Sequence, residues 1–189
     1  MRKIRIFEHI SLDGVIEHDG NYRYGAWTTP YRSPAGAAMV LEAYGPEFDL
    51  LLGRRTYDIF SGFWPAAGNF PMANAINGAT KYVATHQPES LEWGPVQHLG
   101  DNILESVREL KSGEGRDLIV IGSSTVTSAL LDHGLADEVV LITYPVLLGG
   151  GKRLLSDHIG ARELALIDSK STPTGLFINS YKHVGPLAS

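Results

Sequence analysis

The sequence predicts an α/β protein whose central sheet is mostly parallel. Short apolar runs recur along the chain, and stretches of helical length and pattern separate most of them. The last two apolar segments follow each other without such a stretch, so we expect the closing strands to pair antiparallel. The 189 residues can bury one sizeable core, and no linker divides them. We therefore expect a single domain over residues 1–189.

Expected strands are the apolar segments bounded by turn residues. The first is rich in Ile and Phe and ends at Ser11-Leu12-Asp13-Gly14. The second is a short leucine-rich run before Gly53. In chain order the expected strands cover residues 5–10, 48–52, 82–85, 96–99, 117–121, 138–145, 164–169 and 175–183.

Four helices are expected between these strands, over residues 35–44, 54–60, 102–110 and 123–131. Ser33 and Pro34 are typical of an N-cap and a first helical turn. Residues 17–34 and 61–71 are expected to be loops. Long loops inside a compact domain are more often functional than idle.

Composition and motif content exclude several classes of function. The formal charge of −5 is spread without a block of like charges, which gives no support to a nucleic-acid footprint or a membrane-surface patch. The chain has no cysteine, so disulfides and thiol chemistry are excluded. No signal peptide or membrane span is visible, which predicts a cytoplasmic protein. The histidines at positions 9, 18, 86, 98, 133, 158 and 183 show no metal-binding spacing, so we expect no metal site.

The first segment with binding chemistry is Gly53-Arg54-Arg55-Thr56, between an expected strand and a helix. It offers backbone N–H groups at a helix N-terminus, two guanidinium groups and a hydroxyl, which suit a phosphate. The alternative is a tight turn at Gly53 followed by solvated surface arginines.

A second strand-to-helix turn has similar chemistry at Gly122-Ser123-Ser124-Thr125-Val126. Glycine lets the backbone approach a pyrophosphate closely, and the N–H groups that follow face the anion. The alternative is that the serines only cap the helix. Open α/β sheets bind ligands beyond the carboxyl ends of their strands, so the two turns together predict a site for one dinucleotide.

A third segment, Val146-Leu147-Leu148-Gly149-Gly150-Gly151-Lys152-Arg153, follows an expected strand. Three successive glycines favour a site that needs bare backbone or unusual torsions, and a flexible turn is the alternative. No G-x-G-x-x-G, P-loop or G-x-S-x-G motif is present, which disfavours Rossmann dehydrogenases, P-loop NTPases and α/β hydrolases.

The order of these motifs resembles the dihydrofolate-reductase-like superfamily, and in particular the C-terminal reductase domain of the bifunctional riboflavin-biosynthesis deaminase/reductase. The matching pieces are Ser11 to Gly14, Gly53 to Thr56, Thr85, Gly122 to Ser124, and Pro145 to Gly151. The resemblance implies a three-layer fold and NADPH as cofactor.

The resemblance also implies roles for individual residues. Arg54, Arg55 and Thr56, with Thr85 and His86, would carry the preference for NADPH. Gly122, Ser123, Ser124, Thr125 and Val126 would lie against the pyrophosphate, and Val146, Leu147, Leu148 and Gly149 near the nicotinamide and its ribose. Trp27, Tyr57 and Trp64 would border the substrate pocket, with ordinary core packing as the alternative. Asp13 is the candidate catalytic residue, as a positioning group or a proton relay through water.

Two departures from the family pattern stand out. Residues 33–40 contain no acid, where folate reductases carry one early in the first helix, and only Glu42 follows. The proton donor is therefore unassigned. The family's doubled glycine is Gly122-Ser123 here.

The expected activity is NADPH-dependent hydride transfer to a small heterocycle of pteridine or pyrimidine type. One alternative is the riboflavin-pathway reductase that acts on 5-amino-6-(5-phosphoribosylamino)uracil, with Lys152 and Arg153 as candidates for the substrate phosphate. Another is a non-catalytic NADPH-binding module. The pattern of the final strands and the resemblance also predict a homodimer.

Overall fold

The computed structural model describes residues 1–17, 22–156 and 159–188. The turn residues His18 to Asn21, within the loop expected over residues 17–34, lie outside the described residues, as does His158.

One eight-stranded sheet runs through the molecule in the order β4-β3-β2-β5-β1-β6-β8-β7. The first six strands in this order are parallel, and β8 is antiparallel to β6 and β7. The predicted class, a mostly parallel sheet with antiparallel closing strands, is confirmed. The strands are β1 Ile4–Ser11, β2 Phe48–Gly53, β3 Lys81–Ala84, β4 Val96–His98, β5 Asp117–Ile121, β6 Glu138–Tyr144, β7 Arg162–Ser171 and β8 Phe177–Pro186.

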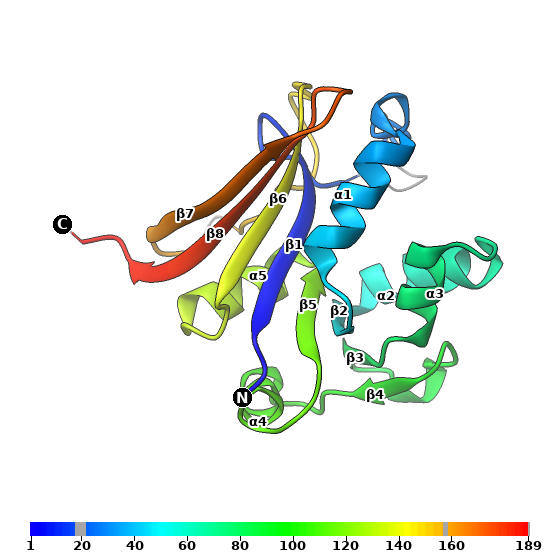
Figure 1. The fold of residues 1–189 in the computed structure, drawn as a ribbon. Coiled ribbons are helices and arrows are strands. Elements are labelled where there is room, and N and C mark those ends of the chain that lie inside the picture. Colours follow the sequence, from blue (N-terminus) through cyan, green and yellow to red (C-terminus); the bar gives the residue numbers. More distant parts are fainter. Residues whose placement is uncertain (18–21, 157–158, 189) are drawn as a thin grey trace.

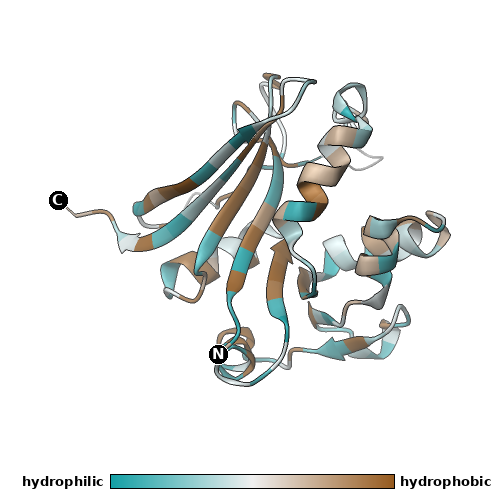
Figure 2. Cartoon of the chain, viewed as in Figure 1, coloured by the Kyte–Doolittle hydropathy of each residue, from teal (hydrophilic) through white to brown (hydrophobic). Residues whose placement is uncertain are grey.

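Helices cover the two faces of this sheet, which gives the expected three layers (Figure 1). On one face α1, α2 and α3 pack on a core that includes Phe7, Leu50 and Ile119. On the other face α4 and α5 pack on Ile6, Leu118 and Val120. Figure 2 shows the hydrophobic residues concentrated along the central strands. The helices are α1 Pro34–Tyr44, α2 Arg54–Phe63, α3 Pro71–Gly78, α4 Ile103–Ser112 and α5 Ser124–Asp132, with short 3-10 turns η1 Thr29–Tyr31, η2 Trp64–Ala66 and η3 Pro88–Ser90.

Local capping explains where the helices begin. The Ser33 hydroxyl accepts a hydrogen bond from the Gly36 N–H, and Pro34 occupies the first turn, as expected. Asn102 caps α4 in the same way by accepting from the Glu105 N–H. α2 begins directly after β2, and α5 begins after the turn Gly122-Ser123 that follows β5. The N-termini of both helices therefore lie at the carboxyl edge of the sheet.

The prediction of a loop over residues 61–71 was wrong in part. α2 continues to Phe63, η2 follows it, and α3 begins at Pro71. Gly62 lowers helix propensity but leaves the hydrogen-bonding pattern intact, so the helix continues until Pro65 approaches. The closing strands are also longer than expected, because β7 and β8 pair along nearly their whole length.

The parallel arrangement gathers the carboxyl ends of six strands at one edge. β1 ends at Ser11, β2 at Gly53 and β5 at Ile121. The segments with binding chemistry therefore converge there, although they are far apart in the chain. No helix among the described residues is long and apolar enough to cross a membrane. The predicted cytoplasmic location stays a prediction.

Candidate active site

The turns after β2 and β5 are packed directly against each other. A Cβ on Gly53 would lie 2.6 Å from the Ser123 Cβ, and a Cβ on Gly122 would lie 2.6 Å from the Thr56 Oγ1. Gly122 has a φ of +62°, and Ser123, at +58°, is in the left-handed region that non-glycine residues rarely adopt. The two predicted phosphate-binding turns therefore form one unit of closely apposed backbone.

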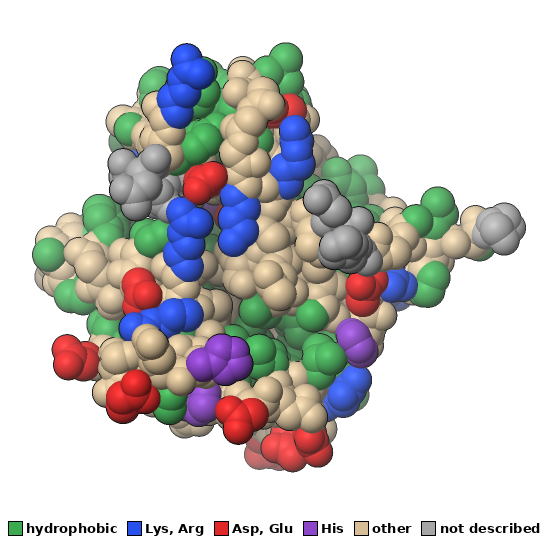
Figure 3. Space-filling model, turned by 180° about the vertical axis from the view of Figure 1, so that it is seen from behind, with side chains coloured by type: hydrophobic (Ala, Val, Ile, Leu, Met, Phe, Trp, Pro, Cys, Tyr) green, Lys and Arg blue, Asp and Glu red, His purple; other side chains and the backbone are tan. Residues whose placement is uncertain are grey.

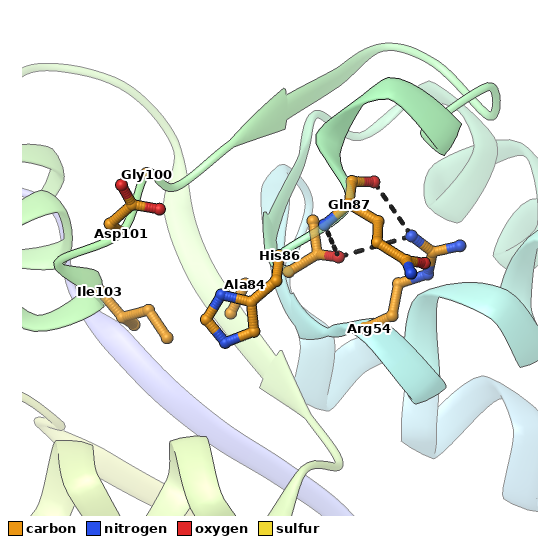
Figure 4. Close-up of a pocket in the computed structure, with 8 residues that line it drawn as sticks. Arg54, Ala84, His86, Gln87, Gly100, Asp101 and Ile103 are labelled. Atoms are coloured by element: carbon orange, nitrogen blue, oxygen red, sulfur yellow. Dashed lines mark hydrogen bonds between the residues drawn. The ribbon is translucent and has the colours of Figure 1, made fainter.

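A cavity of about 320 Å³ opens beside this unit, at the carboxyl ends of β3 and β4, and we call it the Arg54 cavity. In Figure 4, His86 lies between Arg54 and Gln87 on one side and Asp101 and Ile103 on the other. The structure thus brings together the three predicted residues Arg54, Thr85 and His86. The cavity is lined by Arg54, Ala84, Thr85, His86, Gln87, Gly100, Asp101 and Ile103.

Arg54 is held in place by polar contacts on two sides of its guanidinium group. Its Nε donates to Asp58 Oδ1 at 2.8 Å, one turn further along α2. Its Nη1 donates to Ser90 Oγ at 2.6 Å and to the Gln87 carbonyl at 3.1 Å. These contacts preorganise a guanidinium group next to Thr85, whose Oγ1 is 3.4 Å away.

A second cavity, of about 110 Å³, lies on the other side of the paired turns, and we call it the Glu8 cavity. Arg55 Nη2 is 3.0 Å from Glu17 Oε1, and Glu17 Oε2 accepts a hydrogen bond from the Lys152 N–H at 3.0 Å. On the face of the molecule opposite to the view of Figure 1, Lys and Arg side chains gather above a hollow bordered by hydrophobic and His side chains (Figure 3). The Glu8 cavity is lined by Glu8, Ile16, Glu17, Arg55, Thr56, Ile59, Phe60, Ile121, Gly122, Ser123 and Lys152.

Glu8 is a buried acid in the wall of this cavity. Its side chain accepts hydrogen bonds from the Gly122 N–H at 2.8 Å and from the His9 N–H at 3.2 Å. Burial raises the pKa of Glu8 to about 8, although the two N–H donors act in the opposite direction. A carboxyl group of this kind holds its proton near neutral pH.

Asp13 has the opposite environment. Its carboxylate accepts hydrogen bonds from the Ser11 hydroxyl at 2.6 Å, the Leu148 N–H at 3.1 Å and the Gly149 N–H at 2.7 Å. The Ser11 hydroxyl is the main cause that lowers the pKa of Asp13 to about 2, and the two N–H donors add to it. Asp13 therefore ties the turn after β1 to the segment after β6. Its catalytic role stays a prediction, and this geometry favours positioning over proton transfer.

The other residues predicted to contact the cofactor have mixed surroundings. The Ser124 hydroxyl donates to the Arg153 carbonyl at 2.5 Å. Thr125 is exposed, and Val126 points from α5 into the core. Val146 and Leu148 pack on the core below α1, whereas Leu147 is 76% exposed. A role for these residues in cofactor binding stays a prediction.

The three aromatic residues predicted to border the substrate pocket line neither cavity. The Trp27 Nε1 donates to the Glu17 carbonyl at 2.9 Å, and its ring meets Tyr144 edge-on. Tyr57 is buried, and its hydroxyl accepts from the Trp93 N–H at 2.7 Å. Trp64 packs against neighbouring phenylalanines. Trp27 and Tyr57 are buried core residues, and Trp64 packs partly buried against the same core. Their role at a substrate pocket stays a prediction.

Sequence reasoning missed several cavity residues, of which Glu8 is the most informative. It occupies the same strand face as Ile4, Ile6 and Ile10 in the two-residue repeat of β1. An acid within an otherwise apolar strand face is a visible signal. The loops after β3 and β4 bring three further residues to the Arg54 cavity, Gln87, Gly100 and Asp101. No local sequence pattern predicts the course of these loops. No group of three or more His, Asp or Glu side chains in the described part of the chain could hold a metal ion.

Comparison with known proteins agrees with this fold. The chain is 26% identical over 131 residues to the uncharacterized protein YyaP of Bacillus subtilis, covering 67% of this chain and 69% of YyaP. The crystal structure of a proposed riboflavin biosynthesis protein from Shewanella sp. PV-4 superposes with a TM-score of 0.71 at 22% identity, over 96% of this chain and 98% of that one. Dihydrofolate reductase from Enterococcus faecalis, complexed with NADP(H) and RAB-propyl, superposes with a TM-score of 0.58 at 19% identity, over 96% and 94% of the two chains.

The family model described as the RibD C-terminal domain matches residues 2–178, which include every strand of the sheet in whole or in part. The predicted resemblance is thereby confirmed, and the chain belongs to the RibD C-terminal domain family.

Proposed function

We propose that this protein is an NADPH-dependent reductase that transfers a hydride to a small heterocycle of pteridine or pyrimidine type. The observation that carries the proposal is the packing of the Gly53 and Gly122-Ser123 turns between two cavities at the carboxyl edge of the sheet. Ligands of open α/β sheets bind at this edge. Membership of the RibD C-terminal domain family supports a reductase.

The residues at this edge fit a dinucleotide. Gly53 and Gly122 have no room for a Cβ, so their backbone is bare at this edge. The N-terminus of α5 lies at the same edge, where its N–H groups suit an anion. In the proposed arrangement, Arg54, Thr85 and His86 bind the adenosine 2′-phosphate side of NADPH, and the Gly122 to Val126 turn binds the pyrophosphate. Among the described residues, Asp101 is the one acid on the wall of the Arg54 cavity, so its charge would weaken the binding of a phosphate there.

The Glu8 cavity would then hold the reacting groups. NADPH supplies the hydride when bound, and the residues of this chain supply orientation and a site with little water. Ile16, Ile59, Phe60 and Ile121 form an apolar surface on the cavity wall that suits a planar ring. Asp13 would fix the loop after β6 beside this cavity through Leu148 and Gly149.

A second candidate substrate is a phosphoribosylaminopyrimidine. The family supports it, and the cations on the wall of the Glu8 cavity, Arg55 and Lys152, suit a substrate phosphate. Arg153, also a candidate, donates from Nη1 to the Asp13 carbonyl. The two substrate classes differ in the need for a phosphate, so the phosphorylated and dephosphorylated pyrimidines distinguish them.

Titration of NADPH and NADH into the protein, followed by nucleotide fluorescence, tests the proposal. We expect NADPH to bind and to be oxidised when a pteridine or pyrimidine is added. Arg54→Ala should weaken the binding of NADPH. Arg116 is an exposed arginine that pairs with Glu47, and Arg116→Ala should leave NADPH binding unchanged. Binding without oxidation of any heterocycle would support a non-catalytic module, and failure to bind NADPH would contradict the proposal.

We also propose that residues 1–189 act as a single domain that forms a homodimer. β1, from the start of the chain, is a central strand of the same sheet that contains β7 and β8 from its end. This arrangement supports a single domain. β7 is an edge strand, and all but its first residue are exposed. Apolar side chains on and beside it include Leu166 at 61% and Ile167 at 56% exposure. An apolar edge of this kind is a liability in a monomer, and a second copy of the chain would cover it.

A further inference from the structure

We propose that Glu8 is the proton donor of the reduction, giving the proton of its carboxyl group to the substrate nitrogen or oxygen as hydride reaches the adjoining carbon. This inference rests on the proposed function and assigns a group that the absence of an acid in residues 33–40 leaves open.

Glu8 lies where β1 and β5 separate. β1 pairs with β6 as far as Ser11, but its pairing with β5 ends at Ile6. Two residues further along β1, the Glu8 carboxyl fills the gap and accepts from the Gly122 N–H at 2.8 Å. The carboxyl group therefore lines the cavity at the centre of the carboxyl edge, in contact with the turn proposed to hold the dinucleotide.

The surroundings of Glu8 keep it protonated. Its exposed fraction is only 3%, and burial raises the pKa of its carboxyl to about 8. Among the described residues, no lysine or arginine forms an ion pair with Glu8. The charged groups that line the same cavity are Glu17, Arg55 and Lys152. Glu17 pairs with Arg55. The hydrogen bond from the Gly122 N–H is the main interaction that favours ionisation of Glu8, and burial outweighs it. Tyr44, on α1, interacts electrostatically with Glu8 and is itself neutral, because burial raises the pKa of its hydroxyl.

The other acids near the cavity have different states. The Asp13 carboxylate accepts three hydrogen bonds, and its pKa is lowered to about 2, so it is ionised near neutral pH. Glu17 pairs with Arg55 at 3.0 Å. Glu42, the only acid of α1, pairs with Lys170 on β7 at 3.1 Å and lines neither cavity. A carboxylic acid that still carries its proton at neutral pH can act as a general acid.

The step balances as follows for a C=N substrate. The hydride brings two electrons to the carbon, and the π electrons of the double bond move onto nitrogen. Nitrogen forms a bond to the Glu8 proton, and Glu8 becomes a carboxylate that takes a proton from water before the next turnover. The reductant is the reduced nicotinamide nucleotide of the proposed function, which is oxidised.

The protonation of Glu8 can be measured in the protein without any ligand. Infrared difference spectra between pH 5 and pH 9 should show a protonated carboxyl band that disappears with a midpoint near 8. The band should be absent in Glu8→Gln and kept in Glu138→Gln, a control acid at the opposite end of the sheet. A Glu8 that is already ionised at pH 6 would overturn the proposal.

The role of that proton requires turnover. The probes are 7,8-dihydropterin and 5-amino-6-ribosylaminouracil 5′-phosphate, each with NADPH. Glu8→Gln should bind NADPH within about twofold of the wild type and lower kcat by roughly 100-fold. The wild-type kcat should fall above pH 8, and Glu8→Asp should recover part of the rate. Circular dichroism of each variant shows whether the fold is kept.

The outcomes separate this inference from the proposed function. If the wild type reduces a probe and folded Glu8→Gln reduces it equally fast, Glu8 is not the donor and the reductase stands. If Glu8→Gln unfolds, Glu8→Asp decides, because a purely structural role predicts an unchanged pH profile for kcat. If the wild type binds no NADPH or reduces neither probe, the proposed function fails and the donor assignment fails with it.

Discussion

Gly53 and Ser123 meet where two neighbouring parallel strands end: a Cβ on Gly53 would lie 2.6 Å from the Cβ and 2.7 Å from the Oγ of Ser123. Gly53 has an ordinary extended backbone, with φ −76° and ψ 158°. It is therefore the proximity of Ser123, and not the local torsion, that requires glycine at position 53.

This contact predicts opposite effects for two substitutions. Gly53→Ala should lower the free energy of unfolding by about 1–3 kcal/mol, because the methyl group overlaps Ser123. Ser123→Gly should raise it by about 1 kcal/mol, because it relieves a left-handed serine and loses only a weak cap. In the double variant the overlap disappears, so most of the loss should be recovered. Urea denaturation measures all three values.

Gly62→Ala is the matched control for this pair. It lies in α2 with no atom within 4 Å of an added Cβ, so alanine there should be neutral or stabilising. Additive effects of Gly53→Ala and Ser123→Gly would show that the two turns do not touch as described.

The second prediction concerns the charges of the Arg54 cavity. Arg54→Ala should weaken the binding of NADPH roughly 10- to 100-fold, because it removes a charged donor. It also removes the hydrogen bonds from Arg54 to Gln87 and Ser90 at the η3 turn. Asp101→Asn should tighten NADPH by roughly two- to fivefold, because an exposed like charge is removed. Neither change should alter NADH binding by as much. Fluorescence titrations at two salt concentrations measure these constants, and equal effects on the two nucleotides would place the 2′-phosphate elsewhere.

The third prediction follows from the lowered pKa of Asp13. The folded protein binds this proton with a pKa of about 2, against an ordinary value of 3.8. The unfolded chain therefore holds more protons between these values, so the stabilising contribution of Asp13 is complete above about pH 4 and is lost as pH falls toward 2. Asp13→Asn should lose stability at pH 7 and show a shallower fall in acid. Denaturation at pH 7, 4, 3 and 2 checks this, and parallel curves for the two proteins would contradict it.

The fourth prediction concerns the exposed edge strand β7. If a second copy covers this edge, Leu166→Lys or Ile167→Lys should convert a dimer to a monomer, because a charge would be buried at the interface. Phe63→Lys, on α2 and also exposed, should leave the mass unchanged. Light scattering on the eluted protein gives the mass directly. A wild type that elutes as a monomer would rule out the homodimer.

Much of the fold was predictable because its signals are local. The apolar period of β1 and β5, the cap at Ser33 and the glycine that ends β2 each act within a few residues, where sequence patterns are informative. α3 was missed because it has only eight residues, begins at a proline and ends at a glycine, so it shows little helical periodicity. Part of the candidate site was predictable for the same reason, because several of its residues lie in recognisable strand-to-helix turns. Arg54 lines the Arg54 cavity, and Thr56, Gly122 and Ser123 line the Glu8 cavity.

The sequence by itself determined the class of fold, the order of its elements and the two turns with anion-binding chemistry, because these depend on residue periodicity and on backbone freedom at glycine. Only the tertiary structure decided which side chains share a cavity. The burial that raises the pKa of Glu8, the hydrogen bonds that Leu148 and Gly149 donate to Asp13, and the contact of Gly53 with Ser123 all arise between segments distant in the chain. Desolvation and steric overlap depend on what surrounds a group in space, and neighbours in sequence do not supply that information.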